Sequence, residues 1–217
     1  LRKVPKTELD YLITGSTIPW HWKFWNSPML ASCLGRRIAG CHVEQACATG
    51  LKAVTLAGAE VESGSSDVAG VLTFDRTSDS PAGVFPERRA HRRTEALSDV
   101  WDNFGFDPST GKAMIACAGN AARKYKLERR EVDELSLCRH EQYFKAQASG
   151  FLKKILVPFE VLDVQGRVMG VVDSDAGTVH PTLRALRAMK EIDTCVTSGT
   201  QTHPSDGMAC LLVTTRE

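Results

Sequence analysis

The residues best suited to chemistry surround one cysteine, in the stretch Val43-Glu44-Gln45-Ala46-Cys47-Ala48-Thr49-Gly50-Leu51-Lys52-Ala53-Val54. A short β-leaning segment, 41–45, precedes Cys47, and a helical pattern, 50–61, follows it. A cysteine at the first turn of a helix meets unpaired backbone N–H groups and the positive end of the helix dipole. That field favours the thiolate, which is the nucleophilic form of cysteine. From these residues alone, Cys47 is either a nucleophile or an inert buried cysteine.

The elements that must position Cys47 have the lengths of an α/β sheet. The pattern predicts a strand over 9–18 that runs into a loop at Gly15, a helix over 28–38 capped by Ser27, a strand over 41–45, a helix over 50–61 and a strand over 68–74. Alternating strands and helices favour a parallel sheet covered by helices. Binding sites of such sheets gather at the carboxyl ends of the strands, which is where Cys47 would lie.

The rest of the chain is expected to be mostly helical. Helices are predicted over 114–125, 129–148 and 182–189, a hairpin over 164–172 turning at Gly166, and a strand over 210–213. The segment 82–112 reads as a solvated loop, although its arginines could instead contact the phosphates of a ligand. The aromatic run 20–25 is either a hydrophobic plug or subunit contact, or one wall of an apolar pocket.

The composition excludes several classes of function. The chain has 217 residues and a formal net charge of +1, which gives no electrostatic case for nucleic acid or membrane partners. Its first residues carry no apolar signal-peptide core. The seven cysteines form no Cys-x-x-Cys pair, so reduced thiols in a cytoplasmic protein are expected. None lies with histidine at zinc-finger spacing, and we expect no metal.

Four stretches, in order, resemble the thiolases, the enzymes that make or cleave 3-ketoacyl-coenzyme A. The first is the nucleophile segment Gln45-x-Cys47-x-Thr49-Gly50-Leu51-x-Ala53-Val54. The second keeps Ser78 and Pro81 but has Leu72-Thr73 for two usual glycines and Asp75 for the usual Glu. The third keeps Met114, Ala118, Ala122, Tyr125, Arg129, Asp133 and His140, with Gly119 for Glu and Ser136 for Ala. The fourth keeps Val196, Thr197, Gly199, Asp206, Gly207 and Ala209.

The resemblance implies a thiolase-like α/β fold, whose first half is a helix-covered mixed sheet with an inserted, mostly helical loop domain. Residues 1–80 and 182–217 would form the incomplete N-terminal domain, and 81–181 the loop domain. Cys47 would carry the acyl group as a thioester. Ser198 and Thr202 would lie against the pantetheine arm of coenzyme A, which acts as substrate, so no cofactor is expected.

The resemblance covers nearly the whole chain but only about half of a thiolase. The family's second half, with its Gly-His-Pro motif and second catalytic cysteine, is not part of this sequence. We therefore expect a portion of a thiolase, either truncated or one subunit of a split enzyme. The alternative is a non-catalytic thiolase-like subunit that binds acyl-coenzyme A or a partner chain. A homodimer or homotetramer in lipid metabolism is implied, as is a second subunit that supplies the missing half.

Overall fold

The computed structural model describes residues 8–35, 37–78, 80–89, 92–175 and 177–215. The chain divides into two compact units, the first comprising Leu1–Asn103 with Pro204–Glu217 and the second comprising Phe104–His203. We describe each unit by itself. The predicted assignment of 81–181 to an inserted loop domain rests on the family resemblance and stays a prediction. The expectation about a signal peptide concerns residues outside those described.

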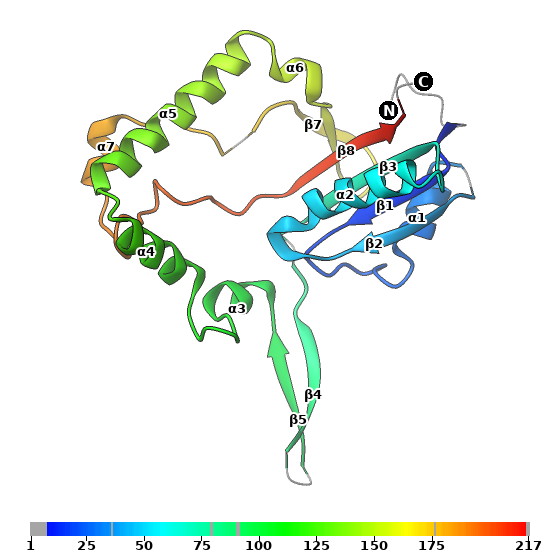
Figure 1. Ribbon diagram of the computed structural model, residues 1–217, viewed down its shortest axis with the longest axis horizontal. Helices are drawn as coiled ribbons and strands as arrows, with labels where there is room; N and C mark the ends of the chain where they lie inside the picture. The colour runs from blue at the N-terminus through cyan, green and yellow to red at the C-terminus, as the bar shows by residue number, and fades with distance from the viewer. Residues whose placement is uncertain (1–7, 36, 79, 90–91, 176, 216–217) are drawn as a thin grey trace. The chain divides into compact units, whose positions relative to one another are not determined.

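The first unit is organised around a mixed four-stranded sheet with the order β2-β1-β3-β8 (Figure 1). Its strands are β1 (Tyr11–Gly15), β2 (Ala39–Val43), β3 (Val68–Asp75) and β8 (Gly207–Thr214). The central strand β1 pairs in parallel with β2 and β3, whereas β8 runs antiparallel to β3. The predicted mixed α/β sheet is confirmed.

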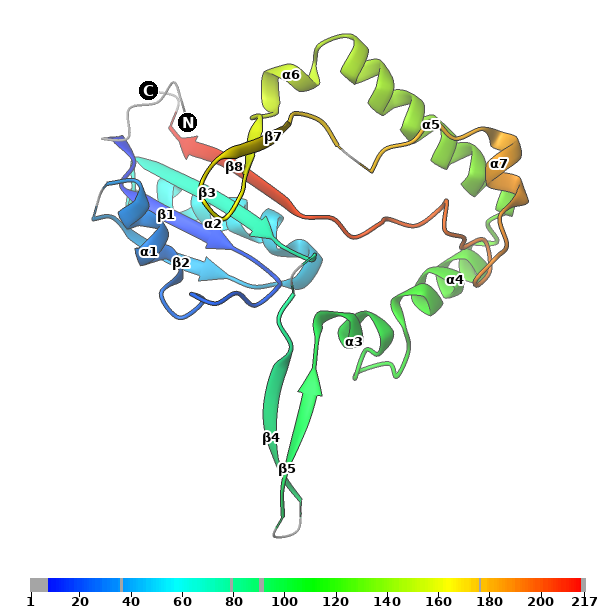
Figure 2. The same ribbon diagram turned by 180° about the vertical axis from the view of Figure 1, so that it is seen from behind.

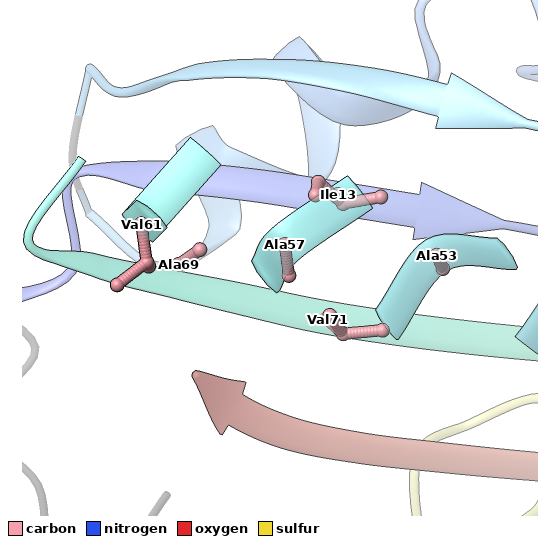
Figure 3. Packing of buried hydrophobic residues seen from close by; sticks show 6 residues of the cluster. All are labelled: Ile13, Ala53, Ala57, Val61, Ala69 and Val71. Atoms are coloured by element: carbon pink, nitrogen blue, oxygen red, sulfur yellow. The ribbon is translucent and has the colours of Figure 1, made fainter. Parts of the chain in front are cut away.

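Two helices cover opposite faces of this sheet, α1 (Asn26–Cys33) and α2 (Thr49–Glu62) (Figures 1 and 2). The buried side of α2 consists of small residues four positions apart, Thr49, Ala53, Ala57 and Val61. This spacing places them on one face of the helix. Ala53, Ala57 and Val61 pack on Ile13, Ala69 and Val71 of β1 and β3 (Figure 3). Small side chains bring the helix close to the sheet and hold its first turn against the strand ends.

The helix α1 begins and ends earlier than the predicted 28–38 with Ser27 as N-cap. Ser27 lies inside the helix and is buried, and its hydroxyl donates to the Cys41 carbonyl oxygen at 2.5 Å. The Ser27 hydroxyl thus bonds to a carbonyl of β2 and does not cap the helix as expected. The chain then turns at Gly35, whose φ is 74°.

The segment 82–112 was predicted as a loop, and that prediction is wrong. It contains a hairpin of β4 (Gly83–Arg89) and β5 (Arg92–Ser98), followed by α3 (Val100–Gly105). The two strands pair from Gly83 opposite Ser98 to Arg89 opposite Arg92. Backbone pairing forms such a hairpin without alternating apolar residues, so hydrophobic periodicity does not reveal it. The arginine side chains proposed to contact phosphates lie outside the described residues.

The second unit is mainly helical, as expected. Its elements are α4 (Met114–Tyr125), α5 (Arg129–Ala148), α6 (Leu152–Ile155), β6 (Phe159–Leu162), β7 (Val168–Val172) and α7 (Leu183–Ala188). The strands β6 and β7 form a hairpin that turns at Gly166, with φ of 79°. Across the described ranges, no helix is both long and apolar enough to cross a membrane.

Candidate functional site

The structure places Cys47 at the junction of a strand and a helix. It is the middle residue of a 3-10 turn, Ala46–Ala48, between the end of β2 at Val43 and the start of α2 at Thr49. Its side chain is exposed, so it is not an inert core cysteine. The first turn of a 14-residue helix follows directly, so Cys47 lies at the positive end of the helix dipole. The catalytic role of Cys47 remains a prediction.

The residue before Cys47 has an unfavourable backbone conformation. Ala46 has a φ of 44°, in the left-handed region, where a residue with a Cβ costs about 1–2 kcal/mol. Two contacts with Thr49 hold this turn. The Thr49 hydroxyl donates to the Ala46 carbonyl oxygen at 2.7 Å and accepts from the Gln45 backbone N–H at 2.8 Å. The threonine of the nucleophile motif therefore closes the turn that presents Cys47.

Gly15, at the end of β1, lets α2 approach the sheet. A Cβ atom at this position would lie 2.6 Å from Thr49 Cγ2 and 3.2 Å from Thr73 Cγ2. Real Cβ atoms do not approach carbon this closely. The absence of a side chain at Gly15 thus permits the first turn of α2 to lie over the carboxyl end of β1.

The loop after β1 adds a second support to the same turn. The hydroxyl of Thr17 donates to the Ala46 carbonyl oxygen at 3.0 Å. Asp75, at the end of β3, accepts the backbone N–H groups of Thr17 and Ile18 through one oxygen, both at 2.8 Å. The part played by Thr17 was not predicted from the sequence. The available signal was its place just beyond the end of a parallel strand that neighbours β2.

A further contact joins two of the motif stretches within the first unit. Asp206 accepts the Ser78 hydroxyl at 2.5 Å, the Ser78 backbone N–H at 2.9 Å and the Thr77 hydroxyl at 3.2 Å. The bond from the Ser78 hydroxyl, together with that from its backbone, holds the pKa of the Asp206 carboxyl below its ordinary value of 3.8. These bonds tie the loop after β3 to the start of β8.

His42 on β2 is a second residue that the sequence analysis missed. Its side chain is only 12% exposed. Its Nδ1 lies 2.9 Å from Thr14 Oγ1, and its Nε2 lies 3.2 Å from Ser16 Oγ. Burial lowers the pKa of His42 below 6.5, although Glu44, with an oxygen 3.6 Å away, acts in the opposite direction. Both ring nitrogens contact hydroxyl groups of β1 and its loop, so His42 links β2 to β1.

The aromatic side chains of the run 20–25 differ in their contacts and in their exposure to solvent. Trp20 contacts Phe74 edge to face, with ring centroids 5.5 Å apart. Trp22, Phe24 and Trp25 are exposed. The interpretations of the run as a plug, a subunit contact or a pocket wall stay predictions.

The predicted coenzyme contacts Ser198 and Thr202 belong to the second unit, whereas Cys47 belongs to the first. Both side chains are exposed. The Ser198 hydroxyl donates to the sulfur of Met189 at 3.5 Å, and a thioether sulfur is a weak acceptor. A ligand oxygen that replaced that sulfur as acceptor would cost the Ser198 hydroxyl only a weak hydrogen bond. The role of both residues in coenzyme binding remains a prediction.

Ser136 and Gly199 determine the local position of Ser198. The Ser136 hydroxyl on α5 donates to the Gly199 carbonyl oxygen at 2.7 Å. A Cβ on Gly199 would lie 2.6 Å from Met189 Sδ and 2.8 Å from Leu186 Cδ2, so the backbone approaches these side chains closely. Ser136 stands where the related motif has Ala, and its hydroxyl supplies an extra tie to this loop.

The chain is similar to a known protein family and to named relatives. Residues 2–217 match the family described as "Thiolase, N-terminal domain". Over 189 residues, the chain is 29% identical to acetyl-CoA acetyltransferase 2 of Arabidopsis thaliana, covering 81% of this chain and 45% of that protein.

The described residues contain no group of three or more His, Cys, Asp or Glu side chains that could hold a metal ion.

Solved structures show the same fold. The acetyl-CoA acetyltransferase of Bacillus anthracis superposes with a TM-score of 0.83 at 24% identity, over 96% of this chain and 54% of that one. Human mitochondrial 3-ketoacyl-CoA thiolase in complex with CoA has a TM-score of 0.86 at 18% identity, over 99% of this chain and 55% of that one. The chain thus spans about half the length of the relatives it matches.

Proposed function

We propose that this chain, which belongs to the thiolase family through its N-terminal domain, takes part in acyl transfer between coenzyme A thioesters. In this proposal Cys47 carries the acyl group as a thioester. The observation that supports it best is the exposed Cys47 side chain between β2 and the first turn of α2. An exposed thiol at the positive end of a helix dipole has the environment of a reactive cysteine.

The proposed cleavage reaction has two steps. The Cys47 thiolate attacks the 3-keto carbon of a 3-ketoacyl-coenzyme A, and a carbon–sulfur bond forms. The bond between C2 and C3 breaks, and its electron pair leaves with acetyl-coenzyme A, which takes up a proton. A second coenzyme A then gives up its thiol proton and attacks the Cys47 thioester, so that Cys47 leaves as thiolate. Dividing the transfer into two steps is the benefit of a covalent intermediate. Condensation of two acetyl-coenzyme A molecules is the same sequence reversed.

Ser198 and Thr202 are proposed to bind the pantetheine arm of the coenzyme. Their hydroxyls are exposed, and that of Ser198 has a weak acceptor in Met189. A homodimer or homotetramer, a partner chain that supplies the family's second half, and a cytoplasmic location are further parts of the proposal.

A second candidate is a non-catalytic thiolase-like subunit that binds acyl-coenzyme A or a partner chain. Claisen chemistry needs a base and an oxyanion site besides a nucleophile. The two candidates differ in whether Cys47 becomes acylated.

The test is to incubate the complete natural polypeptide with acetyl-coenzyme A and locate the acetyl group by peptide mass spectrometry. We expect one acetyl group on the peptide that contains Cys47, and none in Cys47→Ser. Cys33 is also exposed and lies in the same unit, so Cys33→Ser is the matched control and should be acetylated normally.

Binding of coenzyme A is measured in parallel by calorimetry. Tight binding without acetylation of Cys47 would favour the non-catalytic subunit. Equal acetylation of Cys33 and Cys47 would contradict a special role for Cys47, because it would reflect exposure alone.

A further inference from the structure

The peptide that leads into Cys47 is held in a conformation that it would not adopt unaided. Ala46 is in the left-handed backbone region without being glycine. A strained residue of this kind persists only where surrounding contacts determine it. Because a trans peptide is planar, the direction of the Ala46 carbonyl also determines the direction of the Cys47 N–H. Whatever holds this carbonyl therefore orients Cys47.

Two hydroxyl groups from different parts of the first unit bind that carbonyl. Thr49 comes from the helix that follows Cys47, at 2.7 Å. Thr17 comes from the loop after β1, at 3.0 Å, and is 29 residues away in the chain. The Thr49 bond is local and moves with the helix. The Thr17 bond ties the turn directly to the loop after β1, in addition to the packing of α2 on the sheet.

Asp75 in turn fixes Thr17. Its Oδ1 accepts the backbone N–H groups of Thr17 and of the buried Ile18, both at 2.8 Å. Asp75 is the last residue of β3, whose residues Ala69–Thr73 pair with β1. Bonds to a carboxylate are stronger than those between neutral groups. The chain of contacts thus runs from the sheet through Asp75 and Thr17 to the Ala46 carbonyl.

We propose that Thr17 and Asp75 are positioning residues for the nucleophile Cys47. They hold the Ala46–Cys47 peptide so that the thiol faces solvent at the first turn of α2. This inference rests on the proposed function, since it assigns Cys47 a reactivity that positioning can enhance. It concerns two residues outside the nucleophile motif, and one of them, Asp75, stands where the resembling motif has Glu.

The test is the rate of iodoacetamide alkylation at Cys47, measured on the complete natural polypeptide by peptide mass spectrometry. Exposed Cys33 in the same unit is the internal reference. Thr17→Val keeps the side-chain shape but removes the hydroxyl, and Thr17→Ser restores the hydroxyl. We expect Thr17→Val to lower the ratio of Cys47 to Cys33 rates by about threefold to tenfold, the equivalent of one hydrogen bond. Thr17→Ser should stay within about twofold of wild type.

Thr55→Val is the matched control. The Thr55 hydroxyl also donates to a backbone carbonyl, that of Leu51 at 2.9 Å, but it does not contact the turn. A general loss of helix stability would slow alkylation of Cys47 in Thr55→Val as well. The loss of a positioning contact in Thr17→Val alone would leave the Thr55→Val rate unchanged. Asp75 gives a second comparison, because Asp75→Asn keeps an acceptor oxygen and Asp75→Ala does not. We expect only the alanine variant to slow alkylation of Cys47.

The outcomes separate the inference from the function on which it rests. Fast alkylation of Cys47 in wild type with no change in Thr17→Val would overturn the positioning role alone. A wild-type Cys47 that reacts no faster than Cys33 would count against the nucleophile itself, and the inference would fall with it. Equal slowing by Thr17→Val and Thr55→Val would also overturn the inference, because it would reflect stability rather than orientation.

Discussion

The Asp193 carboxylate occupies the space in which a side chain at position 119 would lie. A Cβ atom on Gly119 of α4 would come within 2.5 Å of both carboxylate oxygens. Arg123, one turn along α4, pairs with Asp193 at 2.7 Å, and this bond holds the pKa of the Asp193 carboxyl below 3.8. The related motif has Glu at position 119. In this chain a carboxylate from a distant loop approaches Arg123 instead, and only glycine leaves room for it.

Gly119→Ala is therefore expected to destabilise the second unit by about 1–3 kcal/mol, the usual cost of overpacking. Gly58, inside α2, is the matched control, because a Cβ there meets nothing within 4 Å. Gly58→Ala should stabilise by about 0.5–1 kcal/mol, since alanine favours a helix interior. Urea unfolding followed by circular dichroism measures both. Equal effects of the two substitutions would contradict the assigned role of Asp193.

Two adjacent arginines on α5 should differ sharply in their contribution to stability. Arg129 donates to the fully buried Asp133 at 2.8 Å and to the Leu186 carbonyl at 2.7 Å. Arg129→Met leaves a buried carboxylate unpaired and should cost about 3 kcal/mol. Arg130 makes an equally short pair with Glu134, but its side chain is 72% exposed. Arg130→Met should change stability little in the same unfolding measurement, because solvent screens this exposed pair. Similar losses for the two variants would show that Asp133 finds another partner.

The contact between Gly15 and Thr49 predicts a compensating pair. Gly15→Ala places a methyl group against Thr49 Cγ2 and should destabilise the first unit by about 1–3 kcal/mol. Thr49→Ser removes that methyl but keeps the hydroxyl that bonds the Ala46 carbonyl. The double variant should therefore recover part of the loss. A double-mutant cycle of thermal unfolding, with an interaction energy near zero, would disprove this contact.

His42 predicts a dependence of stability on pH. Burial is the main cause that lowers its pKa below 6.5, and Lys23 acts in the same direction. The unfolded state thus binds a proton more readily than the folded state. The stability contributed by neutral His42 is complete above pH 6.5 and falls as the pH decreases below it, by at most about 1.4 kcal/mol per pH unit.

His42→Gln should flatten this decrease in unfolding free energy below pH 6.5. A wild-type stability that does not fall as the pH decreases below 6.5 would show that folding does not lower the pKa of His42.

The bounds of α4 and α5 were predictable from the sequence alone, because local signals determine them. The structure has Met114–Tyr125 and Arg129–Ala148, as expected. Glu128 and Glu131 form a capping box at the start of α5. Such bonds join residues three apart in the chain and leave a signature in sequence. The order of strand, turn and helix around Cys47 was predictable for the same reason.

Only the tertiary structure revealed what holds Cys47 in place. Thr17 reaches the Ala46 carbonyl across 29 residues, and Asp75 binds the Thr17 N–H across 58. Ser27 similarly gives its hydroxyl to the Cys41 carbonyl, which moved the start of α1 away from the predicted cap. The sequence determined that a cysteine stands between a strand and a helix. The sheet decided how that cysteine is presented, because hydrogen bonds between distant segments have no period or spacing in sequence and form only when parallel strand ends meet.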